Sequence, residues 1–454
     1  MKPGNVVHVL RGTASMYRTV HTRLTARLKS HSGLHAIAAN SGWLLLDRGL
    51  RIVLAVLVGA WVARHLGPER YGELAYWMAV VAVLQVVCTL GLDSIAVRDI
   101  ARDPDASGLI MGTTLRLRLG CGFLCWIAAV SFCLVTNAGD LSSLAIVAFL
   151  GLALLCQPAD IVDLWLQSQT RSRESIPGKA IAYCTSAAMK VALVLSDAPL
   201  WSFASALGIE AVLTAVALVW TYRREPTHQR LRWAASQATY MLRESWPFLI
   251  AGLSVMVYMR IDQFVLRSVA GEKELGIYSA VLPISLAWHV IPMTVCASVL
   301  PRLSVLKQSH PALYRRRLSQ LFSLMAWGGA ACAAVTSALA PWLVGGLLGG
   351  AYESSVAVLR WHSITNIFVF LGVAQSVAIV SDGNSHIALV RTLIGAVVSL
   401  IMNLWLVPIH GALGAAWAAV GAYASAAVLS NAILAPGYLM MQLKALLFIH
   451  APRT

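Results

Sequence analysis

The stretch VYMRIDQFVLRSVAG, residues 257–271, places polar side chains inside an apolar helix. Arg260, Gln263 and Arg267 recur at helical spacing, so they form one stripe on the helix surface. Asp262 lies about 200° round the helix from Arg260, and these two residues therefore do not pair on that helix. Because a charged group inside the membrane is costly, we predict that the stripe faces a cavity. Asp262 is interpreted as a protonatable carboxylate or as the partner of a neighbouring helix.

The chain that carries these charges is strongly apolar. Of its 454 residues 58% are hydrophobic and only 12% are charged, and the mean hydropathy is +0.71. This composition excludes an ordinary soluble domain and is typical of a membrane protein. We predict an all-α polytopic membrane protein of about twelve helices, because a crossing takes about 20 apolar residues. The twelve runs are 43–63, 75–97, 119–136, 143–165, 180–196, 201–221, 246–266, 276–299, 319–343, 356–380, 387–408 and 412–435.

The basic residues predict the orientation in the membrane. The chain has 35 Lys and Arg residues and a net charge of +15. If the N-terminus is cytoplasmic, the inside segments carry 26 of these residues, the outside loops carry only Arg64, Arg70, Arg267 and Lys273, and the rest lie within the spans. Positive residues collect on the cytoplasmic side of membrane proteins. We therefore predict that both termini are cytoplasmic, and we assign the net charge to this bias and not to nucleic-acid binding.

A polar stretch from Tyr222 to Arg243 divides the runs into six and six, which predicts two six-helix bundles. LGPERYGELAY after the first run and AGEKELGIYSA after the seventh share two glycines at the same spacing, an indication of a parallel repeat. The predicted organisation is a basic cytoplasmic tail at 1–40, an N-terminal bundle at 41–222, a cytoplasmic linker at 223–243, a C-terminal bundle at 244–441 and a cytoplasmic tail at 442–454.

Three segments resemble a known family. They are YMRIDQFVLRSVAGEKELGIYSAVLPI (258–284), ARHLGPERYGELAYWMAVVAVLQVVCTLGLDSIAVRDIAR (63–102) and NLWLVPIHGALGAAWAAV (403–420). They are similar to bacterial polysaccharide-biosynthesis flippases, including those for O-antigen, of the multidrug/oligosaccharidyl-lipid/polysaccharide (MOP) superfamily. The resemblance spans roughly residues 40–440. It implies two bundles around a central cavity in the inner membrane, which move an oligosaccharide on a polyprenyl (undecaprenyl) pyrophosphate to the outer leaflet by alternating access, for O-antigen, exopolysaccharide or capsule.

The first predicted helix adds further charges near this cavity. A charge at mid-membrane costs about 2.5 to 3.5 kcal/mol on insertion scales, so Arg48 and Arg51 need a wet cavity, snorkelling or a partner. Asp47 stands four residues before Arg51, and an Asp47–Arg51 pair on one helix face is the structural alternative to a cavity. The substrate-binding prediction comprises Arg48, Arg51, Arg260, Gln263 and Arg267; Asp47 and Asp262 are predicted as ion-coupling or structural carboxylates.

Other charged residues near the spans are expected to be structural. For Asp93, Asp160 and Asp163 we favour salt bridges with Arg98 or Arg171 over an ion site. Arg360 is expected to snorkel to the outer boundary, whereas the sequence leaves the role of Lys190 open. The eight cysteines form no metal motif, and neither a metal nor a cofactor is predicted.

These features predict a non-enzymatic transporter whose partners are a lipid-linked oligosaccharide, membrane lipids, a coupling H⁺ or Na⁺, and polysaccharide polymerase machinery, without nucleic acid. The sequence lacks a GxxxxGK[ST] loop, so we expect an ion gradient and not ATP as the energy source. One alternative is a multidrug exporter of the same superfamily, in which carboxylates would face the cavity. A membrane glycan polymerase or ligase is a second alternative, disfavoured by the short outside loops. Twelve spans and not fourteen argue against the peptidoglycan-precursor flippase branch.

Overall fold

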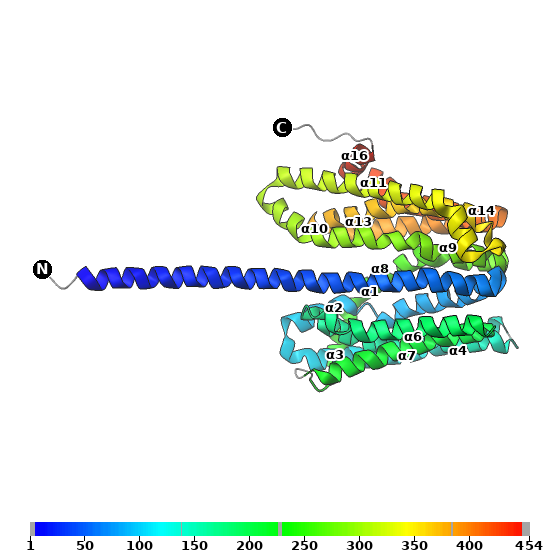
Figure 1. Cartoon of the computed structure of the whole chain (residues 1–454), viewed down its shortest axis with the longest axis horizontal. Coiled ribbons are helices and arrows are strands. Elements are labelled where there is room, and N and C mark those ends of the chain that lie inside the picture. The colour runs from blue at the N-terminus through cyan, green and yellow to red at the C-terminus, as the bar shows by residue number, and fades with distance from the viewer. Residues whose placement is uncertain (1–4, 138, 226–228, 383–384, 447–454) are drawn as a thin grey trace.

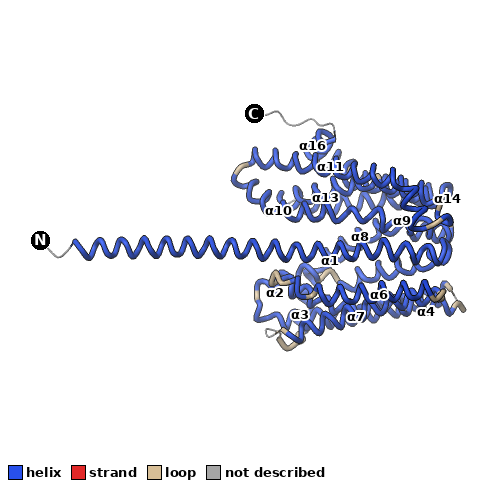
Figure 2. Tube along the Cα trace, in the orientation of Figure 1, coloured by secondary structure: helices blue, strands red, loops and turns tan. Residues whose placement is uncertain are grey.

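The computed structural model describes residues 5–137, 139–225, 229–382 and 385–446, and the side chains of this set except residues 5–45, 385 and 446. The described chain is built from helices and contains no strand (Figure 1, Figure 2). Helices suit a membrane because each satisfies its own backbone hydrogen bonds where water is absent. The prediction of an all-α polytopic membrane fold is confirmed.

The helices follow one another with short connections. Their bounds are α1 Asn5–Thr89, α2 Asp93–Arg102, α3 Ser107–Thr136, α4 Leu141–Cys156, α5 Ile161–Ser168, α6 Ile176–Leu195, α7 Leu200–Arg224, α8 Ala235–Val269, α9 Gly271–Leu286, α10 Val290–Ser309, α11 Pro311–Leu343, α12 Ser355–Ser363, α13 Thr365–Asp382, α14 Ser385–Ala424, α15 Asn431–Leu434 and α16 Pro436–Leu446.

Two of these helices are each a pair of membrane crossings. The described residues contain ten candidate spans by length and composition, and the segments 46–102 and 386–434 are far longer than one crossing needs. Gly67 in α1 and Gly411 in α14 have positive φ values of 74° and 54°, where the chain leaves helical geometry. Met402 and Gly421 lie against each other across the second break, so the chain reverses there. Counting both arms of each helix gives the twelve predicted crossings.

The helices gather into two groups on either side of the first arm of α1. Figure 1 shows α2–α7 on one side and α9–α16 on the other. Apolar clusters fill each group: one contains Trp77, Ile146 and Phe203, and another contains Phe322 and Phe370. We call the first group together with α1 the N-terminal half, and the second group together with α8 the C-terminal half. The end where α7 leads to α8 is the linker end, and the end with Gly67 and Gly411 is the hairpin end.

The two halves meet closely at the hairpin end. Gly72 of α1 and Gly276 of α9 pack so tightly that a Cβ on Gly72 would lie 1.9 Å from the carbonyl oxygen of Glu272, and one on Gly276 would lie 1.8 Å from that of Pro68. Gly271 precedes Glu272 with a φ of 86°, as Gly67 precedes Pro68. The offset that relates Gly67 to Gly271 also relates Gly72 to Gly276. The two similar loops of the sequence therefore make an approximately twofold contact with each other.

Helix α8 links the halves at both of its ends. Near the linker end Met241 is fully buried in a cluster with Leu92 and Trp165 of the N-terminal half. Near the hairpin end Leu266 is buried in a cluster with residues of α9 such as Tyr278. The seventh crossing thus begins against one half and ends in the other.

The boundaries predicted for the two tails do not coincide with the ends of the helices. Helix α1 begins at Asn5, well before the predicted boundary at residue 41, although the candidate span within it starts at Leu46. At the other end α16 continues to Leu446 and packs beside α11. Residues 1–4 and 447–454 of the predicted tails lie outside the described residues.

Candidate functional site: a charged cavity between the halves

Arg51 lies at the junction of three cavities. Its guanidinium carbon sits 4.1 Å from the ring centre of Tyr183 on α6, a cation–π contact. The central cavity has a volume of about 510 Å³, a side pocket toward the hairpin end about 240 Å³, and a vestibule at the linker end about 700 Å³. Arg51 and Tyr183 line all three. The first arm of α1 therefore holds its arginine in open space and not in the packed core.

Arg260 faces the same central cavity from the opposite half. The cavity is lined mainly by α1, α4, α6 and α7, and Arg260 of α8 is the residue that the C-terminal half contributes among the described lining residues. Its Nη1 donates a hydrogen bond to Oε1 of the buried Gln263, 3.2 Å away. The structure thus brings Arg51, Arg260 and the supporting amide of Gln263 together.

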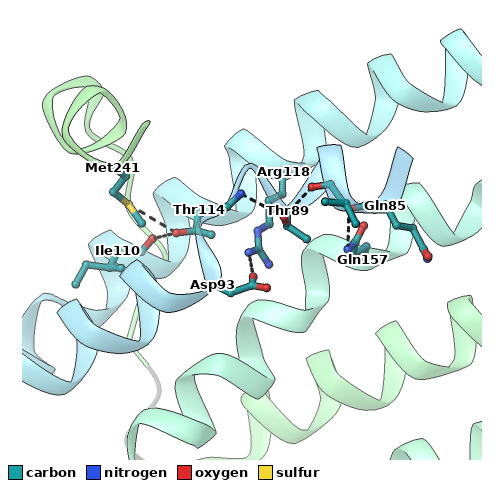
Figure 3. A network of polar contacts seen from close by, with 10 residues as sticks. Gln85, Thr89, Asp93, Ile110, Thr114, Arg118, Gln157 and Met241 are labelled. Carbon is teal, nitrogen blue, oxygen red and sulfur yellow. Dashed lines mark hydrogen bonds and ion pairs between the residues drawn. The ribbon is translucent and has the colours of Figure 1, made fainter. Parts of the chain in front are cut away.

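The vestibule holds further charges, several of which are paired. Arg118 of α3 is 1% exposed and forms an ion pair with Asp93, as Figure 3 shows. Lys179 Nζ lies 2.6 Å from Asp163 Oδ2. Arg48 and Asp47 line this vestibule at the linker end, and neither lines the central cavity. Arg48 therefore shares the vestibule with Arg51 but does not share the central cavity with Arg260.

The expected partners of the acidic residues were wrong. Asp93 pairs with Arg118 and Asp163 pairs with Lys179, not with Arg98 or Arg171. Arg98 instead contacts Asp99, and Arg171 contacts Glu174 and Glu225. The helices that become neighbours decide these pairs, and spacing within the sequence does not reveal them. Asp160 lines both the central cavity and the vestibule.

The structure separates Arg267 and Asp262 from the central cavity. Arg267 lies at the hairpin end, where its Nη2 is 2.5 Å from Glu272 Oε1. Asp262 is buried, and its carboxylate accepts hydrogen bonds from the Tyr278 hydroxyl of α9 and from the backbone N–H of Gln263. Asp262 therefore contacts a neighbouring helix, the second of the two roles considered for it.

Three further charges have definite positions. Among the described side chains, Asp47 and Arg51 form no ion pair with each other. The Oδ1 atom of Asp47 is buried and has no hydrogen-bond partner among the described residues. Lys190 of α6 lies 3.4 Å from Glu210 of α7. Arg360 is exposed at the hairpin end and donates to the backbone oxygen of Ser337.

Several cavity residues were not singled out from the sequence. Gln85, Gln157 and Glu210 line the central cavity beside Arg51. Glu210 carried a usable signal, because an ionisable residue within an apolar span is by default a functional candidate. Tyr183 carried none, since a tyrosine in a transmembrane helix is common. Among the described residues no cluster of three His, Cys, Asp or Glu side chains has the geometry to hold a metal ion.

Helices that cross the membrane many times around a charged cavity define a multi-pass membrane transporter. A family model described as polysaccharide biosynthesis protein matches residues 37–307. This segment is more than half of the chain, and the protein belongs to that family. The resemblance found in the sequence is confirmed. No curated protein matches the sequence.

Solved structures of the MOP superfamily share the fold. The lipid II flippase MurJ in an inward closed conformation matches with a TM-score of 0.69 and 13% identity, over 91% of each chain. An inward-facing MATE family multidrug resistance transporter matches at 0.61 and 15%, over 87% of this chain and 94% of that one. A MOP superfamily transporter from Pyrococcus furiosus, described by a binding pocket of reverse polarity, matches at 0.60 and 14%, over 91% and 94%.

Proposed function

We propose that the protein is a flippase that moves an oligosaccharide linked to polyprenyl pyrophosphate from the cytoplasmic to the periplasmic leaflet of the bacterial inner membrane, for synthesis of a cell-surface polysaccharide. Membership of the polysaccharide biosynthesis family supports the cargo class. The observation that carries the proposal is that Arg51 and Arg260, from opposite halves, line one cavity.

The cargo explains why arginines face this cavity. A pyrophosphate linkage carries about two negative charges, and an unpaired charge in a medium of low dielectric is very costly. Arg51 and Arg260 supply forked donors that pair with phosphate oxygens. The same wall also carries the amides of Gln85 and Gln157 and the carboxylates of Asp160 and Glu210. Movement of the two halves would then expose the bound pyrophosphate first to one leaflet and then to the other, driven by an ion gradient.

Deleting the gene in its host tests this proposal. Lipid-linked repeat units should accumulate on the cytoplasmic leaflet and the surface polysaccharide should disappear, while glycosyltransferase activity in membranes stays unchanged. Measurements are a carbohydrate stain of the cell surface and mass spectrometry of extracted lipids. Normal surface glycan with altered resistance to cationic dyes would favour the multidrug-exporter alternative. Short glycans on the surface without long chains would favour a polymerase.

The orientation is tested by reporter fusions. The proposal puts the linker end in the cytoplasm, so fusions at Arg230 and Lys307 should report the cytoplasm. Fusions at Asp140 and Glu353, at the hairpin end, should report the periplasm. The reason is the excess of Lys and Arg at the linker end. Alkaline phosphatase activity at Arg230 equal to that at Asp140 would contradict this orientation.

A further inference from the structure

Lys190 and Glu210 form an ion pair that borders the cavities. Lys190 Nζ lies 3.4 Å from Glu210 Oε2, and the two side chains are 18% and 25% exposed. Both line the side pocket, and Glu210 also lines the central cavity. The pair is therefore reachable from the space that Arg51 occupies, and it is not closed off in an apolar core.

The side pocket has more positive than negative charge. Its described lining contains two cations, Arg51 and Lys190, and one carboxylate, Glu210. A bare cation at this depth is costly, so Glu210 offsets one of the two charges when no ligand is present. An anion that enters from the central cavity competes with Glu210 for Lys190.

Among the lysine–carboxylate pairs of the described residues, this one has the longest distance. Lys179 lies 2.6 Å from Asp163 and Lys307 lies 2.5 Å from Asp382, against 3.4 Å for Lys190 and Glu210. Lysine carries a compact charge on a flexible stem and changes partner without a fixed fork geometry. Arg51, by contrast, is held against the Tyr183 ring. The geometry thus combines one fixed cation with one that is able to move.

We propose that Glu210 is an internal counter-ion that holds Lys190 while the cavity is empty, and that the diphosphate group of the cargo displaces it. Lys190 then becomes a third phosphate-binding cation with Arg51 and Arg260. This inference rests on the proposed function and extends its binding site. It gives the empty carrier a neutral pair in place of an exposed lysine, so that the return movement carries one unpaired cation fewer through the membrane.

Binding of a lipid diphosphate probe, with empty nanodiscs as the blank, separates this role from a structural one. The full-length protein is purified into phosphatidylcholine nanodiscs, and Kd for geranylgeranyl diphosphate is measured by calorimetry at fixed ionic strength. Glu210→Gln should tighten binding about tenfold because it frees Lys190, and Lys190→Gln should weaken it about tenfold. Adding Glu210→Gln to the Lys190→Gln protein should then change nothing further.

Asp382→Asn is the matched control, because it releases Lys307 from a similar pair that does not line the cavities. It should leave Kd unchanged. An unchanged or weaker affinity in Glu210→Gln would overturn the inference. So would a Glu210→Gln protein that fails to fold when the double variant folds and binds normally, since the pair would then be structural.

Arg260→Ala, measured in the same assay, distinguishes failure of the counter-ion role from failure of the proposed function. Weaker binding in Arg260→Ala with no effect at Lys190 or Glu210 rejects only the counter-ion role. Unchanged binding in Arg260→Ala removes the cationic site on which the proposed function depends.

Discussion

Arg260→Ala should abolish export of the surface polysaccharide while the amount of protein in the membrane stays close to normal. Arg260 lines the central cavity, and its described hydrogen bond is to Gln263 on its own helix, so its removal takes little from the packing between helices. Arg51→Ala should behave in the same way, because Arg51 is exposed to the cavities. Lys at either position should restore part of the export, since it keeps the charge and loses the fork. Surface carbohydrate and membrane immunoblots measure the two quantities.

Asp93→Asn provides the contrasting control. This substitution removes the carboxylate of Asp93 and leaves the guanidinium of Arg118, which is 1% exposed, without its ionic partner. The Asp93 side chain is itself 53% exposed, so the cost should lie below the about 3 to 5 kcal/mol of a fully buried pair, and protein abundance should fall together with export. Normal export from an abundant Arg260→Ala protein would end the hypothesis that helix α8 binds the pyrophosphate.

The second large effect is expected at the crossing of α1 and α9. In Gly276→Ala the new Cβ would lie 1.8 Å from the backbone oxygen of Pro68, and in Gly72→Ala it would lie 1.9 Å from that of Glu272. Backbone does not move aside as a flexible side chain does, so the helices must separate. Overpacking costs about 1 to 3 kcal/mol in soluble cores, and we expect at least the upper part of this range. Thermal unfolding in detergent should show a lower Tm for both variants.

Gly120→Ala is the control for this effect. Gly120 lies within α3, and a Cβ there would meet nothing within 4 Å. Alanine favours a helix over glycine by about 0.5 to 1 kcal/mol, so Tm should stay equal or rise slightly. A Gly276→Ala protein as stable as Gly120→Ala would contradict the close approach of the two helices.

Much of the fold was predictable because the membrane imposes simple rules. Apolar runs of sufficient length gave the twelve crossings, and the shared glycine spacing of two loops indicated the repeat that the contact of Gly72 with Gly276 now displays. The charges of the site were also visible, since Arg51 and Arg260 stand out in apolar segments. Their placement on one cavity required the three-dimensional arrangement.

Other features of the site could not be predicted, because they depend on a residue's depth in the membrane and on which helices become neighbours. Arg267 shares a helix face with Arg260, but seven residues add about 10 Å along the axis, which carries it to Glu272 at the hairpin end. The partner of Lys190 is on another helix, and no spacing rule connects α6 to Glu210 of α7. The packing of Met241 against the N-terminal half was likewise hidden, because a helix assigned to one half carries no mark of contact with the other.

The glycine crossing also bears on how such a protein can diversify. The contact between α1 and α9 is made by main-chain atoms around Gly72 and Gly276, so it depends little on the side chains elsewhere on both helices. The cavity walls, in contrast, consist of side chains such as Gln85, Gln157 and Tyr183. Substitutions that adapt the cavity walls to a new sugar should therefore leave the contact between α1 and α9 unchanged. Cargo preference can then evolve independently of how the two halves meet at the hairpin end.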